Sequence, residues 1–189
     1  MSYDLGKKIG MGAFALSTLA MVFQHVSALF IYRFSESVVI GFYNVLAVLH
    51  FGLIIIAAGG FAMMWLMGGN LFDILIAGLM AVGIIARIFI PQAGHGVEAL
   101  SIASLVVQAE SALYLLVWAY KYYRKDLITA VLLVGAFIVS IFANPLTNFL
   151  TVGVGLGRSF CIFLISIPLE IILGCIKLYA MMNESEKKK

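Results

Sequence analysis

The sequence predicts an all-α integral membrane protein, a polytopic bundle of about six transmembrane helices joined by short loops. The first observation is composition: 63% of the 189 residues are hydrophobic and only 11% are charged, whereas a soluble domain is about 45–50% apolar and about 25% charged. The second is that the apolar residues fall into runs of about 20, the length of a membrane-spanning helix. These observations exclude a soluble globular domain, a disordered tail and a nucleic-acid-binding protein.

Polar or helix-breaking residues separate the apolar runs, which together form one membrane domain over residues 1–189. The first run is too long for a cleaved signal peptide. The predicted spans lie near residues 10–32, 38–60, 71–91, 97–120, 127–144 and 157–180. The breaks between them are Arg33–Glu36, Gly68–Asn70, Pro91–Gly94, Lys121–Asp126 and Asn144-Pro145.

The basic residues gather on one side of this six-span arrangement, which the positive-inside rule assigns to the cytoplasm. We therefore expect a multi-pass protein of the cell membrane with both termini cytoplasmic, and residues 183–189 form a charged tail there. The segment 145–156 on the other side is either re-entrant or interfacial. The basic residues expected on the cytoplasmic side are Lys7, Lys8, Lys121, Arg124, Lys125, Lys177, Lys187, Lys188 and Lys189. Those expected on the opposite side are Arg33, Arg87 and Arg158.

Ionisable residues inside the spans are the strongest functional signal, because a charge at the centre of a bilayer costs at least about 2.5–3.5 kcal/mol. Counted along their spans, His50, Glu110 and Glu170 lie near the midplane, His25 lies one or two turns further out, and Lys177 lies near the cytoplasmic surface. Helical periodicity predicts inward-facing stripes that include Thr18, Met21 and His25; Ala47, His50 and Ile54; Thr129, Leu133, Ala136 and Ser140; and Glu170, Gly174 and Lys177.

His25 and His50 lie on adjacent antiparallel spans, an arrangement that can ligate one b-type haem from both sides or form a quinone site. The depths of the two histidines argue against a haem. His50 lies about five residues deeper than His25, a mismatch of about 7 Å at about 1.5 Å per residue. Two buried, hydrogen-bonded histidines are the alternative interpretation. The cofactor is therefore left open, with haem b as one candidate.

Glu110 and Glu170 lie at a depth similar to that of His50, so the three groups can form a hydrogen-bonded triad suited to proton relay or cation binding. Gln108 and Arg87 extend this candidate site for an ion, a proton or a substrate. Pro168 precedes Glu170 by two residues and predicts a kink beside that carboxylate. A neutralised polar network with a purely structural role is the alternative.

Arg158 follows a glycine-rich stretch, residues 153–157, at the start of the last predicted span. Free amides, the helix dipole and a guanidinium together favour an anion, such as a lipid headgroup. An arginine that anchors the helix at the interface is the alternative. The stretch is not a dinucleotide-binding motif, because it lacks the spacing and the strand that such motifs need.

No catalytic or metal site is predicted, because zinc-protease, nucleophile-elbow and phosphate-loop motifs are all absent. Cys161 and Cys175 lie about 21 Å apart along one helix, too far for a disulfide. His95 and Glu98 form only a weak pair of potential ligands in a loop.

Three functional classes remain, and all involve the lipid bilayer. The first, which we favour at this point, is a small subunit of a larger membrane complex, such as an electron-transfer complex with haem b or quinone near His25 and His50. Its partners would be other membrane subunits. The second is a transporter or channel for a small solute or ion that uses Glu110 and Glu170. The third is a lipid-modifying enzyme, for which the motifs give little support.

Overall fold

The computed structural model describes residues 3–28, 36–93, 97–155, 157, 164–165 and 167–186. All the regular structure in these ranges is helical, which confirms the predicted all-α class for the described part of the chain. The helices are α1 (Tyr3–Ala28), α2 (Glu36–Leu66), α3 (Leu71–Ala93), α4 (Val97–Tyr122), α5 (Leu127–Asn148), the short π-helical turn η1 (Phe149–Gly153) and α7 (Ile167–Glu186).

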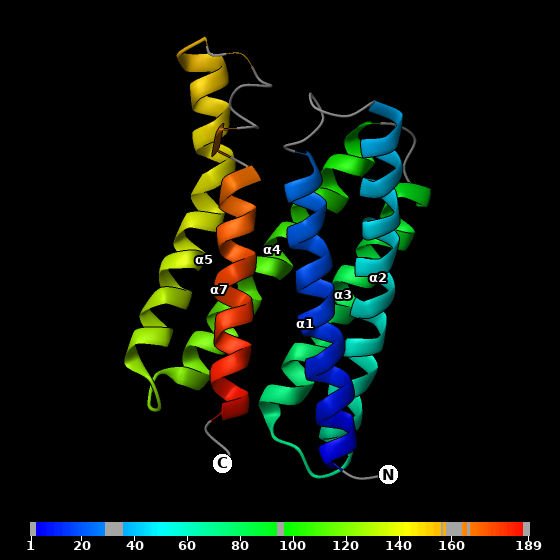
Figure 1. The fold of residues 1–189 in the computed structure, drawn as a ribbon, viewed down its shortest axis with the longest axis vertical. Helices are drawn as coiled ribbons and strands as arrows, with labels where there is room; N and C mark the ends of the chain where they lie inside the picture. The colour runs from blue at the N-terminus through cyan, green and yellow to red at the C-terminus, as the bar shows by residue number, and fades with distance from the viewer. Residues whose placement is uncertain are drawn as a thin grey trace.

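The α-helices run up and down along one common direction, so that successive helices are antiparallel (Figure 1). Both chain ends lie at the same end of the bundle, together with the α2–α3 and α4–α5 connections. The basic residues Lys7, Lys8, Arg124 and Lys125 belong to these terminal and connecting segments. The arrangement therefore places them toward one end of the molecule.

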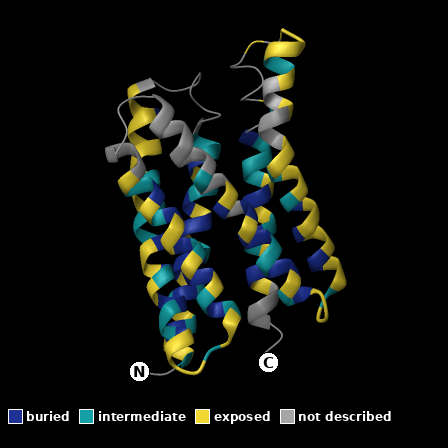
Figure 2. Cartoon of the chain, turned by 180° about the vertical axis from the view of Figure 1, so that it is seen from behind, coloured by how far each residue is buried: buried dark blue, intermediate teal, exposed yellow. Residues whose placement is uncertain are grey.

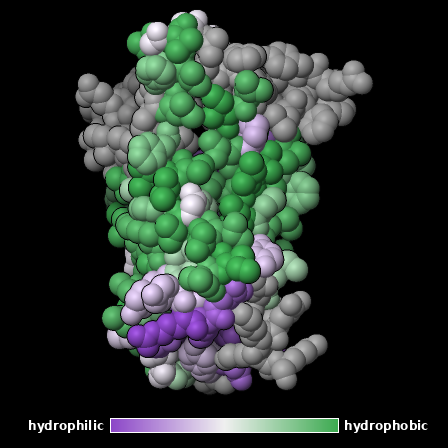
Figure 3. Space-filling model, turned by 90° about the vertical axis from the view of Figure 1, so that its left-hand side faces the viewer, coloured by the Kyte–Doolittle hydropathy of each residue, from purple (hydrophilic) through white to green (hydrophobic). Residues whose placement is uncertain are grey.

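Three helical segments in the described residues are long and apolar enough to cross a membrane: Tyr3–Ser27, Ser37–Leu66 and Leu71–Phe89. Leu127–Phe142 is a shorter apolar helix. Figure 3 shows the same character on the surface, where a broad apolar face lies above a hydrophilic end. These features support a membrane protein, while the count of six spans stays a prediction.

Large apolar side chains lie both inside and outside the bundle, and Figure 2 shows buried and exposed residues alternating along the helices. Phe61, Ile76 and Trp118 are almost fully buried, and the ring of Phe14 lies 5.4 Å from that of Trp118, centroid to centroid. On the outside, Val48 is 73% exposed. An apolar outer surface is expected where lipid, rather than water, surrounds the helices.

The connection between α2 and α3 is fixed by local hydrogen bonds. Gly68 has a φ of 89°, and the amides of Gly68 and Gly69 donate to the carbonyls of Trp65 and Met64, which is the Schellman pattern that ends a helix. Asn70 then caps α3: its side chain accepts from the amide of Asp73, and the Asp73 carboxylate accepts from the amide of Asn70. The turn therefore reverses the chain within a few residues.

Glycines allow α1 and α2 to approach closely. A Cβ at Gly60 on α2 would overlap the backbone of Gly10 on α1, and a Cβ at Gly10 would lie 3.1 Å from the amide nitrogen of Phe61. Gly6 and Gly10 are spaced four apart, as in the small-residue motifs that bring membrane helices together. The two helices therefore pack backbone against backbone at this end of the bundle.

The helices differ from the predicted spans mainly at their ends. α1 begins at Tyr3, seven residues before its predicted span, because helical hydrogen bonding continues past the apolar run. Pro91 and Pro145 lie inside the last turns of α3 and α5 instead of after them. Each lacks the amide that would bond to the carbonyl four residues earlier, and each helix ends within three residues. α7 begins at Ile167, so Pro168 lies in its first turn. The predicted kink beside Glu170 stays a prediction, because most of the preceding chain lies outside the described residues.

Most of the chain from residue 156 to residue 166 lies outside the described residues, as do His95 and Arg158. Of the segment 145–156, residues 145–148 belong to α5 and residues 149–153 form η1, while its predicted re-entrant or interfacial position stays a prediction.

We predict that Gly60→Ala destabilises the protein by about 1–3 kcal/mol, because the new methyl group overlaps the backbone of Gly10. Gly59→Ala is the matched control, since a Cβ there has no neighbour within 4 Å. Thermal unfolding of the purified protein in detergent measures both. Equal stability of the two variants would show that the α1–α2 contact is looser than described.

Candidate functional site

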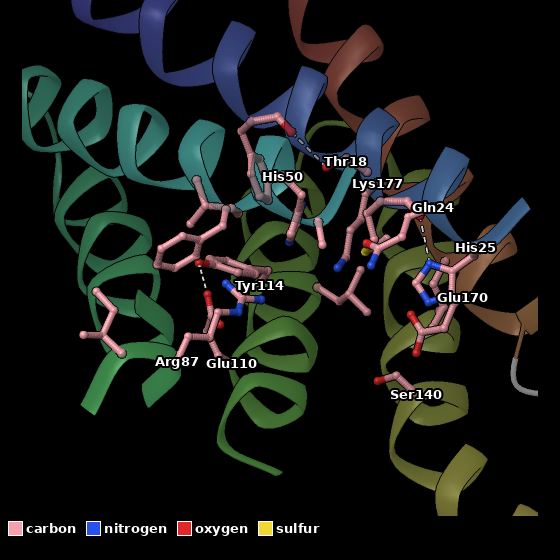
Figure 4. A pocket seen from close by; sticks show the side chains of 18 residues that line it. Thr18, Gln24, His25, His50, Arg87, Glu110, Tyr114, Ser140, Glu170 and Lys177 are labelled. Atoms are coloured by element: carbon pink, nitrogen blue, oxygen red, sulfur yellow. Dashed lines mark hydrogen bonds between the residues drawn. The ribbon is translucent and has the colours of Figure 1, made fainter. Parts of the chain in front are cut away.

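A cavity of about 670 Å³ lies among the helices, and each of the six α-helices in the described part of the chain contributes to its lining. Its walls are partly apolar, with Phe14, Phe51 and Leu173 among them. Its polar lining residues, labelled in Figure 4, are Thr18, Gln24, His25, His50, Arg87, Glu110, Tyr114, Ser140, Glu170 and Lys177.

Four of these side chains are ionisable, two acidic and two basic: Glu110, Glu170, Arg87 and Lys177. Glu110 is 4% exposed and Lys177 is 6% exposed. Arg87 and Lys177 both act on Glu110 through their charges, and Glu170 acts on Lys177 in the same way. The charges are therefore close enough to compensate one another inside the bundle.

Glu110 is held between α3 and its own helix. The hydroxyl of Tyr114, one turn further along α4, donates to its carboxylate. On the other side, a Cβ at Gly83 of α3 would overlap the same carboxylate. Glycine at position 83 is therefore what allows the acid group to lie against α3.

Arg87 follows Gly83 by one helical turn, so both positions face α4. The Nη1 atom of Arg87 is buried and has no hydrogen-bond partner among the described residues. A buried guanidinium nitrogen without an acceptor is unfavourable, because it loses water and gains nothing in return. This nitrogen is available to an acceptor inside the cavity.

His50 joins α2 to α1. Its Nδ1 lies 3.0 Å from the carbonyl oxygen of Ser17 and 2.8 Å from the hydroxyl oxygen of the same residue. The Ser17 hydroxyl donates to the carbonyl of His50 at 3.3 Å. A carbonyl only accepts, so the proton is assigned to Nδ1, and in the neutral ring Nε2 then keeps a free lone pair.

His25 has the same local arrangement within α1. Its Nδ1 lies 2.8 Å from the carbonyl oxygen of Met21, one turn earlier. The proton is therefore also assigned to Nδ1, and Nε2 is the acceptor in the neutral ring. Both histidines line the cavity as hydrogen-bond acceptors or ligands, each with its ring orientation fixed by the backbone.

The structure brings five of the predicted site residues to this one cavity: His25, His50, Arg87, Glu110 and Glu170. The side chain of Gln108 and all of Arg158 lie outside the described residues, so their predicted roles are untested.

Two expectations about the surroundings of these residues are not met. Lys177, expected near the surface, is buried and lines the cavity, because α7 places it two turns from Glu170 on the same face. No hydrogen bond between described residues joins His50 to Glu110 or Glu170 in a triad, since His50 bonds to Ser17 and Glu110 to Tyr114.

Three functional neighbours were missed by the sequence reasoning. Tyr114 follows Glu110 by four residues, a spacing that could have indicated their contact. Gly83 and Ser17 carry no such signal. Their roles depend on how neighbouring helices are rotated and shifted against each other, which periodicity along one helix does not reveal.

Among the described residues, no group of three or more histidine, cysteine, aspartate or glutamate side chains is arranged to hold a metal ion. Comparisons with protein-family models, with curated proteins and with solved structures find no match to this chain. The function is therefore inferred from the cavity alone.

We predict that Gly83→Ala destabilises the protein by about 1–3 kcal/mol, because its methyl group pushes the Glu110 carboxylate away from α3. Gly78→Ala on the same helix is the control, since a Cβ there has no neighbour within 4 Å. Thermal unfolding in detergent measures both variants.

A double-mutant cycle identifies the group responsible. In a Glu110→Ala background, Gly83→Ala should have little further effect, because the colliding carboxylate is gone. If Gly83→Ala is equally destabilising with and without Glu110, the carboxylate does not lie against Gly83.

Proposed function

We propose that this chain is a small membrane carrier that binds a polar solute in its central cavity. The observation that carries the proposal is the convergence of Glu110, Glu170, Arg87 and Lys177 from three helices, α3, α4 and α7, on one cavity. Ionisable groups within membrane-spanning helices are unfavourable, face the interior, and commonly mark the path of a substrate or an ion.

Two features favour a binding site over a purely structural network. The volume of about 670 Å³ falls in the range of small-molecule sites, about 300–1,000 Å³. In addition, Arg87 Nη1 has no partner among the described residues, whereas a structural network would be expected to satisfy each buried donor. A bound solute supplies the missing acceptor.

The proposed topology follows the sequence. We infer six spans in the cell membrane, with the end that carries both termini facing the cytoplasm. The basic residues of the α4–α5 connection, Arg124 and Lys125, support this orientation, and both termini lie at the same end as that connection (Figure 1).

A second candidate function is a subunit of an electron-transfer complex with other membrane subunits as partners. The orientation of His25 and His50 favours it, because a metal-bound histidine also donates its second ring nitrogen to a backbone carbonyl. A Soret band that disappears in both His25→Ala and His50→Ala would support this candidate in place of the carrier. No arrangement among the described residues favours a lipid-modifying enzyme.

The carrier proposal predicts that solutes of the right charge class raise the unfolding temperature of the purified protein and accumulate in proteoliposomes. The solutes to be tested are carboxylates, amines, zwitterions, sugars and inorganic ions. For a solute that is taken up, Glu110→Gln and Glu170→Gln should each lower the uptake rate at least about tenfold, because each removes a charge that contributes about 1.5–3 kcal/mol in a hydrogen bond.

Asp4→Asn is the matched control, since it makes the same change at an exposed residue outside the cavity. It should leave uptake unchanged. Size-exclusion chromatography checks that each variant remains folded. Uptake that is insensitive to both cavity variants, or a protein that no solute stabilises, would refute the carrier proposal.

A further inference from the structure

We propose that the solute is a small zwitterion of the amino-acid class, with its carboxylate at Arg87 and its ammonium group near Glu170. The inference rests on the proposed function, because it names the substrate class of the same cavity. Figure 4 shows the two ends that it requires: Arg87 lies with Glu110 and Tyr114 at one side, and Glu170 lies with His25 at the other.

The Arg87 end of the cavity offers a donor without an acceptor. Nη1 of Arg87 is buried and has no partner among the described residues. The neighbouring carboxylate of Glu110 is already held by the Tyr114 hydroxyl and packs against the position of Gly83. A planar carboxylate is the group that a guanidinium binds best, through parallel N–H donors.

The opposite end offers acceptors. Glu170 lines the cavity and makes no hydrogen bond to another described side chain. His25 presents a ring whose Nδ1 is engaged by the Met21 carbonyl, which leaves Nε2 as an acceptor. An ammonium group has three donors and no acceptor, so it matches a carboxylate oxygen and an imidazole nitrogen that accepts.

The charge balance of the cavity favours a ligand with no net charge. Its two carboxylates and two basic side chains sum to zero when both histidines are neutral. The sum stays at zero if a proton passes from Lys177 to Glu110, since both then become neutral together. A net charge added to this cavity would remain uncompensated in surroundings of low dielectric, whereas a zwitterion adds none.

The groups at the two ends of the cavity favour a zwitterion over an anion, a cation or a neutral amide. A simple organic anion would bring no donor to Glu170 and would add a negative charge to the cavity, and a simple cation would leave Arg87 Nη1 without an acceptor. A neutral amide would meet both ends, but hydrogen bonds between neutral and charged groups are weaker than those between two opposite charges.

The test uses matched ligands on the unmodified protein. The zwitterions are alanine, leucine, phenylalanine and glycine betaine, and each amino acid is compared with the acid that lacks its ammonium group, the amine that lacks its carboxylate, and the neutral amide of that acid. Equilibrium binding to purified protein in detergent gives the affinities. We expect at least one amino acid to bind at least about tenfold more tightly than all three of its analogues.

Two variants test which end of the cavity binds the ammonium group and which end binds the carboxylate. Glu170→Gln should abolish the preference for the amino acid over its deaminated analogue, and Arg87→Gln should abolish the preference over its decarboxylated analogue. Arg124→Gln, which removes an exposed charge outside the cavity, should change neither preference. If Arg87→Gln fails to fold, the analogue series on the unmodified protein and Glu170→Gln still decide the question.

Several results would overturn the inference. Equal or tighter binding of an acid, an amine or an amide, relative to its parent amino acid, would show a different substrate class while leaving the carrier proposal intact. Tighter binding of betaine than of the three amino acids would also contradict it, because a quaternary group cannot donate to Glu170. If no solute of any class binds, both the zwitterion and the carrier proposals fail.

Discussion

The unfavourable energy of charge inside hydrocarbon is the constraint on which the rest of this structure depends. An apolar outer surface, with Val48 among its most exposed side chains, implies that lipid surrounds the helices. Charged side chains can then exist only where other helices cover them and where opposite charges lie nearby. Arg87 and Lys177 lie near Glu110 for this reason, and Glu170 lies near Lys177.

Close contacts between α1 and α2 help to cover the charged side chains. At one end of the bundle, Gly10 and Gly60 let α1 and α2 touch along their backbones. Further along the same pair, Ser17 and His50 exchange hydrogen bonds between the helices. Because these bonds use the Nδ1 side of His50, the ring is fixed in orientation and its other nitrogen is kept for the cavity. Packing and site chemistry therefore share the same residues.

Much of the cavity lining could be predicted from helical periodicity. Thr18, Met21 and His25 on α1, and Glu170 with Lys177 on α7, lie on the faces that the spacing indicated. The depth of Lys177 could not be predicted, because counting along one span ignores how α7 is placed against its neighbours. The same limit explains why the contact between Gly83 and Glu110 was missed, since it depends on the register of α3 against α4.

Cysteine accessibility in the membrane tests the enclosed polar cavity most directly. With Cys161 and Cys175 replaced by serine, Ser140→Cys places a thiol in the cavity lining, and Val48→Cys places one on the outer face. A small, water-soluble thiol reagent should modify the cavity thiol, a stabilising solute should slow that reaction, and the outer thiol should stay unmodified. Rapid modification at position 48 together with an unreactive thiol at position 140 would contradict the proposed arrangement.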